Sequence, residues 1–257
     1  MKLNHSITGT DAGLPVLMAH GLFGQGRNLG ALARRLAEGR RVISLDMRNH
    51  GDSFHDPDHS YAALAGDLAD AIADLGGCAD LVGHSMGGKA AMMLALTRPR
   101  MVRKLAVLDI APVAYGHSQN HLIDAMASLD LSAIDRRSTA DAALAERIDD
   151  PGVRAFLLQS LDLKSDPKAW RLNLPVLRDQ MDRLVGWPDD LPGAAFDGPV
   201  LEIAGEQSDY VTDAGQAALR ECFPQARTVR VKGAGHWLHA DAPETVSEIL
   251  VGFLGAG

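Results

Sequence analysis

The stretch that decides the fold is Leu81-Val82-Gly83-His84-Ser85-Met86-Gly87-Gly88-Lys89. An apolar run at 78–82 leads into this Gly-x-Ser-x-Gly pattern, and a helical run of small residues at 90–96 follows it. A strand, a tight turn and a helix in this order are typical of a nucleophile elbow. Glycines are needed there because the backbone turns sharply and the helix packs close to the strand. A plainer interpretation is a glycine-rich turn in which Ser85 only caps the following helix.

Further strands and helices alternate on both sides of this stretch. Short apolar runs at 15–19 and 105–108 are typical of strands that are covered on both faces, and the sequence predicts further strands at 41–45, 199–204 and 228–231. Segments with apolar residues at helical spacing separate most of them. We therefore expect an α/β fold with a largely parallel sheet and helices on both faces.

The pattern changes between residues 113 and 197. Apolar spacing there is purely helical, and prolines separate the segments. The sequence predicts a core domain formed by residues 1–112 and 198–257, with a helical cap subdomain at 113–197.

Composition excludes several classes of protein. The chain has 257 residues and a formal net charge of −8, which disfavours nucleic-acid binding. No apolar run approaches the roughly 18 residues that span a bilayer, and the N-terminus lacks the apolar centre of a secretory signal. Cys78 and Cys222 form no disulfide framework. We expect a cytoplasmic protein, either a monomer or a homodimer.

Ser85 needs a base, because a serine hydroxyl is a weak nucleophile until its proton is removed. His236 is the leading candidate, because it follows the last predicted strand, and the loops after parallel strands gather at one edge of the sheet. Two carboxylates could orient this histidine. Asp109 ends the strand after the elbow and Asp209 lies in the loop after the next strand, and spacing alone does not choose between them.

An oxyanion hole requires backbone N–H groups that point at the developing negative charge. Met86, at the start of the helix after the nucleophile, supplies one. The loop His20-Gly21-Leu22-Phe23-Gly24 should supply the second, from Leu22 or alternatively from Phe23. Phosphate binding by this loop is disfavoured, because it has neither GxGxxG spacing nor a Gly-Lys-Ser/Thr sequence.

Other polar and aromatic residues have less specific interpretations. Phe23, His84 and Trp237 are candidates for contacts with a substrate. Lys89 is either a charge on a helix surface or a contact for an anion. The loop at 50–59 resembles a metal site in composition but matches no ligand spacing, so we expect a solvated polar loop and no bound metal.

Taken together, five motifs resemble the α/β-hydrolase superfamily, and within it the small bacterial YbfF-like serine esterases. They are His20-Gly21-Leu22-Phe23-Gly24, Asp46-Met47-Arg48-Asn49-His50-Gly51, Gly83-His84-Ser85-Met86-Gly87-Gly88-Lys89, Leu108-Asp109-Ile110-Ala111-Pro112 and Gly233-Ala234-Gly235-His236-Trp237-Leu238-His239-Ala240. The resemblance implies an eight-stranded sheet with an all-helical cap between strands six and seven. It also implies Ser85 as nucleophile, His236 as base and Asp109 as the acid, although Asp209 beside Ser208 departs from the family pattern.

These residues predict a serine hydrolase that cleaves carboxylic esters, or acyl thioesters, through an acyl-enzyme and without a metal or organic cofactor. The same triad would also support a C–C bond hydrolase or a cofactor-free perhydrolase. A ligand receptor without catalytic activity is disfavoured, because a pure binding protein has no need of nucleophile, base and acid together.

Overall fold

A seven-stranded sheet lies at the centre of the described structure. The computed structural model describes residues 1–188, 191 and 193–255. The strand order is β1-β3-β2-β4-β5-β8-β9, and all neighbouring strands are parallel except β1 and β3. The strands are β1 (His5–Thr8), β2 (Val16–Ala19), β3 (Val42–Leu45), β4 (Ala79–His84), β5 (Val102–Leu108), β8 (Val200–Gly205) and β9 (Ala226–Val231). The predicted α/β-hydrolase architecture, with its mostly parallel sheet, is confirmed.

The expected eighth strand is absent from the described residues. β1 forms one edge of the sheet and pairs only with β3. Residues just before β1 bond instead to the loop after β3: the N–H of Asn4 donates to Ser53 Oγ at 2.8 Å, and Asn4 O accepts from the N–H of Asp46 at 2.9 Å. The sheet formed by the described residues has seven strands, so the expected strand number was wrong by one.

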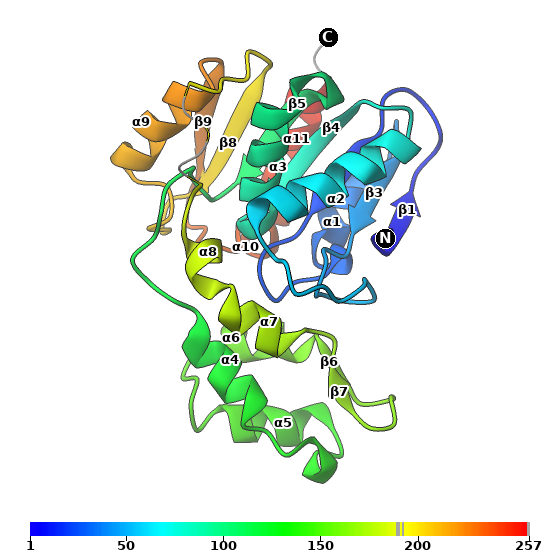
Figure 1. Cartoon of the computed structure of the whole chain (residues 1–257), viewed down its shortest axis with the longest axis vertical. Helices are drawn as coiled ribbons and strands as arrows, with labels where there is room; N and C mark the ends of the chain where they lie inside the picture. Colours follow the sequence, from blue (N-terminus) through cyan, green and yellow to red (C-terminus); the bar gives the residue numbers. More distant parts are fainter. Residues whose placement is uncertain (189–190, 192, 256–257) are drawn as a thin grey trace.

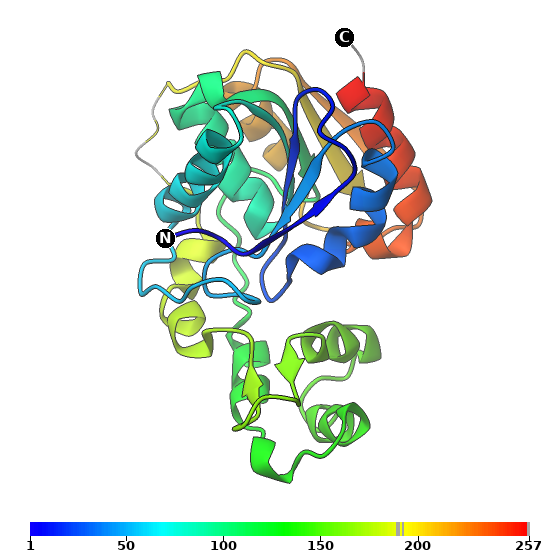
Figure 2. The ribbon, with the colours of Figure 1, turned by 90° about the vertical axis from the view of Figure 1, so that its right-hand side faces the viewer.

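Helices cover both faces of the sheet. α1 and α11 pack together on one face, and α2 and α3 pack together on the other (Figures 1 and 2). The helices of the core are α1 (Gly30–Leu36), α2 (Tyr61–Asp74), α3 (Met86–Thr97), α9 (Asp213–Cys222), α10 (Leu238–Asp241) and α11 (Pro243–Gly255). Short 3-10 turns span Gly26–Leu29, Pro99–Met101 and Leu131–Ala133.

The strands at the centre of the sheet are fully buried, whereas the edge strands β1 and β9 are partly exposed. Every residue of β2, β3 and β4 is buried, because helices cover both faces of these parallel strands. The predicted apolar stripe of α2 faces the core through Leu64, Leu68 and Ile72. Ser60 begins this helix, and its Oγ accepts a hydrogen bond from the N–H of Ala63.

Residues 113–197 are called the insert below, and its elements from α4 to α8 lie beyond the carboxyl ends of the strands (Figure 1). The described elements of the insert are α4 (Asn120–Ala127), α5 (Arg137–Leu144), α6 (Pro151–Leu158), β6 (Leu161–Asp162), β7 (Ala169–Trp170), α7 (Leu174–Asp179) and α8 (Met181–Val185). Residues 189, 190 and 192, in the expected return to the core, lie outside the described residues.

The expectation of an all-helical insert was wrong, because β6 and β7 form a small antiparallel sheet. Strands of two residues are too short to leave an alternating pattern in the sequence. Polar contacts close this hairpin: Arg171 forms an ion pair with Asp162 at 2.8 Å.

Candidate active site

Ser85 lies at the corner between β4 and α3. Its backbone is left-handed, with φ 51° and ψ −118°. The neighbouring glycines are required by close backbone approach, because a Cβ on Gly87 would lie 2.4 Å from Ala19 O and one on Gly83 would lie 2.5 Å from Gly87 O. Ser85 makes no side-chain cap to α3. The helix-capping interpretation is therefore wrong, and the hydroxyl is directed elsewhere.

The hydroxyl of Ser85 meets His236, which in turn meets Asp109. His236 Nε2 lies 3.1 Å from Ser85 Oγ, and His236 Nδ1 lies 2.7 Å from Asp109 Oδ2. Because the carboxylate accepts from Nδ1, Nε2 is left to accept the proton of the serine hydroxyl. The structure thus brings His236 together with Ser85 and Asp109, which lie 151 and 127 residues before it in the chain, in the order serine, imidazole, carboxylate.

Hydrogen bonds fix the position of the Asp109 carboxylate. It is completely buried, and its Oδ1 accepts the N–H of Gly205 at 2.8 Å. The hydroxyl of Ser208 donates to Oδ2, the oxygen that also faces His236. Asp209, the alternative acid, is an exposed residue of the same loop. Of the two candidate carboxylates, only Asp109 reaches the imidazole.

The loop after β2 passes close to Ser85, because a Cβ on Gly21 would lie 3.1 Å from Ser85 Cβ. The N–H of Phe23, the alternative oxyanion donor, already donates to His50 Nε2 at 3.2 Å. Within the described ranges, no hydrogen bond occupies the N–H of Leu22 or that of Met86. The structure is therefore compatible with Leu22 and Met86 as the two oxyanion donors, but not with Phe23.

Buried, neutral histidines support this loop. His20 Nδ1 donates to Gly21 O at 2.8 Å, and its Nε2 accepts the N–H of Met47 at 2.9 Å. His50 Nδ1 donates to Arg48 O, so its Nε2 remains an acceptor for the loop. Burial lowers the pKa of both His20 and His50, which keeps each ring in the neutral form that these contacts require. The sequence did not reveal this role for His50.

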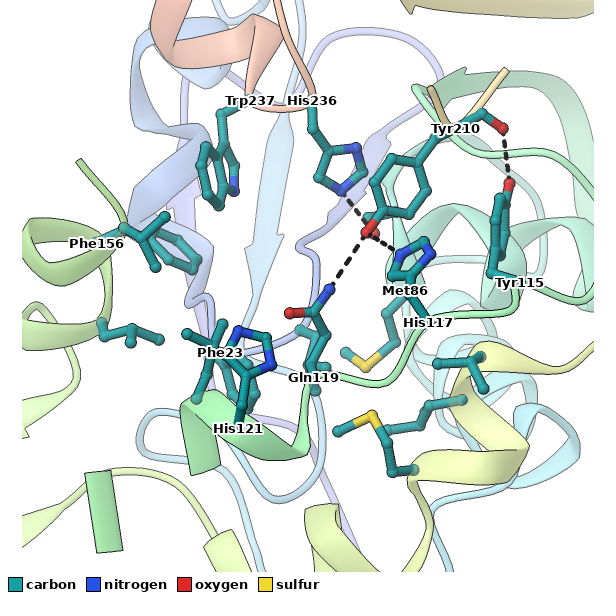
Figure 3. A pocket seen from close by; sticks show the side chains of 18 of the residues that line it. Phe23, Met86, Tyr115, His117, Gln119, His121, Phe156, Tyr210, His236 and Trp237 are labelled. Atoms are coloured by element: carbon teal, nitrogen blue, oxygen red, sulfur yellow. Dashed lines mark hydrogen bonds between the residues drawn. The ribbon is translucent and has the colours of Figure 1, made fainter. Parts of the chain in front are cut away.

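A pocket of about 480 Å³ opens beside Ser85, between the sheet and the insert. The three predicted contact residues, Phe23, His84 and Trp237, all line it. Trp237 faces Phe156 of α6, with ring centroids 5.6 Å apart (Figure 3). His84 also holds the backbone of His236, because its Nε2 donates to His236 O at 2.9 Å.

Tyr210 was missed by the sequence analysis. Its ring stacks on His236 with centroids 3.9 Å apart and an interplanar angle of 18°. Its hydroxyl lies 2.9 Å from His117 Nε2 and is contacted by Gln119, both from the insert (Figure 3). In the sequence, Tyr210 is a single aromatic residue in a loop, and such a residue forms no pattern that would predict stacking.

No metal site accompanies this arrangement in the ranges 1–188, 191 and 193–255: no group of three or more His, Cys, Asp or Glu side chains could hold an ion there. In the same ranges, none of the helices combines the length and the apolar character that a membrane span requires. His50 and His59 of the metal-like loop are buried and stack on each other with centroids 5.5 Å apart. The expectation of a solvated loop was wrong for these two residues.

The chain resembles known proteins along nearly its whole length. Residues 15–243 match the family described as alpha/beta hydrolase fold. The chain is 42% identical to Esterase YbfF of Escherichia coli (strain K12) over 90% of this chain and 89% of that protein. It is 38% identical to an sn-1-specific diacylglycerol lipase of Mus musculus, over 99% of this chain and 85% of the lipase. A solved marine microorganism esterase has a TM-score of 0.93 and 34% identity, covering 98% of this chain and 99% of that chain. The resemblance drawn from the motifs is confirmed.

Proposed function

Because the chain belongs to the α/β-hydrolase fold family, we propose that it hydrolyses carboxylic esters through an acyl-enzyme formed on Ser85. Its relatives include an esterase and a lipase, and the prediction of a carboxylic-ester hydrolase is confirmed at the level of this class. The observation that carries the mechanism is the line of contacts from Ser85 Oγ through His236 to Asp109. These contacts are those of a serine nucleophile with its base and acid.

The reaction follows from this geometry. His236 Nε2 takes the proton of Ser85 as Oγ attacks the ester carbonyl, and Asp109 stabilises the imidazolium through Nδ1. The N–H groups of Leu22 and Met86 hold the oxyanion. His236 then protonates the leaving alcohol. In the second half, His236 removes a proton from water, which attacks the acyl group and releases the acid and Ser85.

The insert serves as a cap that completes the substrate site. Residues 113–197 form this cap, and residues 1–112 and 198–257 form the catalytic domain. Apolar residues from both parts line the pocket, among them Phe23 and Ile110 of the core and Phe156 and Leu184 of the insert. This lining suits the apolar part of an acyl ester. Acyl thioesters belong to the same proposal, because the same nucleophile attacks their carbonyl. The two cysteines are free thiols, which fits a reducing, cytoplasmic location.

Labelling with a fluorophosphonate probe tests the proposal. The wild-type protein should gain one probe mass, and peptide mapping should place the adduct on Ser85. Ser85→Ala should lose both the label and the hydrolysis of p-nitrophenyl butyrate and of a butyryl thioester. Ser138→Ala, which changes an exposed serine of the insert, is the matched control and should label as the wild type does. Full hydrolysis by Ser85→Ala would overturn the mechanism.

A further inference from the structure

Lys89 has the largest of the fully buried side chains, with 1% of its surface exposed. Lysine is almost never buried to this extent unless its charge is compensated. Here three backbone carbonyls surround the ammonium. Nζ donates to Val113 O at 2.8 Å, to Gly186 O at 2.6 Å and to Val185 O at 3.3 Å. An ammonium has three N–H donors, so these carbonyls account for all of them.

The three carbonyls lie at the two ends of the helical part of the insert. Val113 precedes α4, and Val185 and Gly186 follow one another at the end of α8. The two ends also bond directly, because the N–H of Tyr115 donates to Val185 O at 2.8 Å. We call residues 113–115 and 185–186 the two linkers. One side chain of the core therefore holds the linkers together.

The side chain that holds the linkers starts from the helix that carries the nucleophile. Lys89 lies one turn after Ser85 in α3, and its N–H donates to Ser85 O at 3.0 Å. Lys89 also lines the pocket. The ring of Tyr115 lies 4.6 Å from Nζ and the ring of Tyr61 lies 5.6 Å from it, so aromatic faces complete the shell around the cation.

Neither interpretation drawn from the sequence fits this environment. Lys89 is not a surface charge, because it is buried. It is not an anion contact, because the carbonyls already accept its N–H groups. None of the hydrogen bonds of Nζ reaches Ser85 or His236, so Lys89 acts on the reaction only through what it positions.

We propose that Lys89 is a positioning residue: its ammonium ties both linkers of the insert to the helix of the nucleophile and so sets the walls of the pocket relative to Ser85. Other contacts also hold the insert to the core. For example, the N–H of Asn173 donates to Asn49 O at 3.0 Å. Removing the ammonium should therefore loosen the linkers and the adjoining wall of the pocket without releasing the whole insert.

Hydrogen exchange of the Tyr115 amide tests this directly, because that amide bridges the two linkers. In Lys89→Met the side chain loses its charge and ends one atom short of the position of Nζ. The Tyr115 amide should then exchange about tenfold faster or more, the effect of losing a charge-assisted hydrogen bond, while amides of β4 keep their protection. Lys168→Met, which removes a lysine bonded to Ile134 O within the insert, should leave Tyr115 unchanged. Unchanged exchange in Lys89→Met would overturn the proposal.

Kinetics supply a second measurement, which rests on the proposed function. In Lys89→Met the KM for p-nitrophenyl butyrate should rise about tenfold with kcat changed much less, because the pocket wall moves and the nucleophile with its base and acid does not. An equal loss in kcat would count against positioning. Failure of the proposed function has a different signature, namely hydrolysis that survives in Ser85→Ala, and the exchange experiment does not depend on it.

A pH series on the wild-type protein covers the case in which Lys89→Met does not fold. Burial lowers the pKa of Lys89 to about 7, and a neutral amine has one N–H fewer for the three carbonyls. The titratable groups that face it are Tyr61 and Tyr115, whose pKa values burial raises; the charged residues of α8, Asp182 and Arg183, are exposed. Protection of the Tyr115 amide, corrected for intrinsic exchange, should fall between pH 6 and 9 relative to β4. Constant protection over a range in which the ¹⁵N resonance of Lys89 Nζ shows the loss of its proton would contradict the proposal.

Discussion

Replacing Asp109 with Asn separates the two candidate acids, and Asp209→Asn is the matched control because it removes the same charge from the loop after β8, whose Ser208 bonds to Asp109. In Asp109→Asn, the amide oxygen can keep the hydrogen bond from Gly205, and the NH₂ group then faces His236 Nδ1. Two donors cannot pair. The proton of the imidazole must therefore move from Nδ1 to Nε2. A protonated Nε2 can no longer accept the proton of Ser85.

A wrong tautomer of this kind lowers kcat by about 10⁴ in the serine protease template, and at 1.36 kcal/mol per tenfold this corresponds to about 5 kcal/mol of transition-state stabilisation. We expect a loss of about this size in Asp109→Asn. Asp209→Asn should stay close to wild-type activity, because Asp209 is exposed and does not reach the imidazole.

The assay is turnover of p-nitrophenyl butyrate at pH 7.5, with near-ultraviolet circular dichroism to confirm that both variants fold. A folded Asp109→Asn variant within tenfold of the wild type would refute the reasoning. A large loss in Asp209→Asn would do the same.

Gly21→Ala should lower kcat about 100-fold, the effect of losing one oxyanion donor, because its Cβ would lie 2.7 Å from His84 Nδ1 and must displace the loop. Gly116→Ala has open space around its Cβ and should keep wild-type kcat in the same assay; equal losses in both variants would contradict the steric argument. Acid should also destabilise the fold, because burial lowers the pKa of His59 to about 3 and that of His239 to about 4. In the unfolded chain these histidines bind protons near pH 6.5, whereas in the folded chain they stay neutral to lower pH. The free energy of unfolding is therefore unaffected by them above pH 6.5 and decreases as the pH falls below it. At pH 5 each should cost about 2 kcal/mol, and urea unfolding at pH 7.5 and pH 5 that gives equal free energies would rule this out.

The sequence predicted the corner around Ser85 because its requirements are local. A serine with left-handed backbone between a strand and a helix needs small neighbours at fixed offsets, and Gly83 and Gly87 are those neighbours. His236 could be placed because loops after parallel strands meet at one edge. The choice between Asp109 and Asp209 could not be made in this way. It depends on which carboxylate reaches the imidazole of His236 from its own loop.

Features that depend on packing between distant segments left no pattern in the sequence. Tyr210 stacks on His236 only because the insert and the loop after β8 converge there. His50 supports the loop after β2 from a segment that resembled a polar loop. From the sequence, Lys89 could only be placed on a helix next to the glycines. Its burial depends on two linkers that lie 24 and 96 residues further along the chain and fold back onto it.

Strain in the described structure gathers where these loops meet. Four non-glycine residues of the ranges 1–188, 191 and 193–255 have positive φ: Phe23 (64°), Asn49 (64°), Ser85 (51°) and Asp109 (54°). Each follows one of the strands β2, β3, β4 and β5 at its carboxyl end. Such a backbone costs about 1–3 kcal/mol at each residue and persists only where its surroundings hold it. Hydrogen bonds hold all four N–H groups, to His50 Nε2, Phe54 O, Leu108 O and Ile203 O respectively. The buried histidine and the neighbouring segments thus stabilise the strained corners. From these corners Ser85 and the loop after β2 line the pocket, and Asp109 reaches His236.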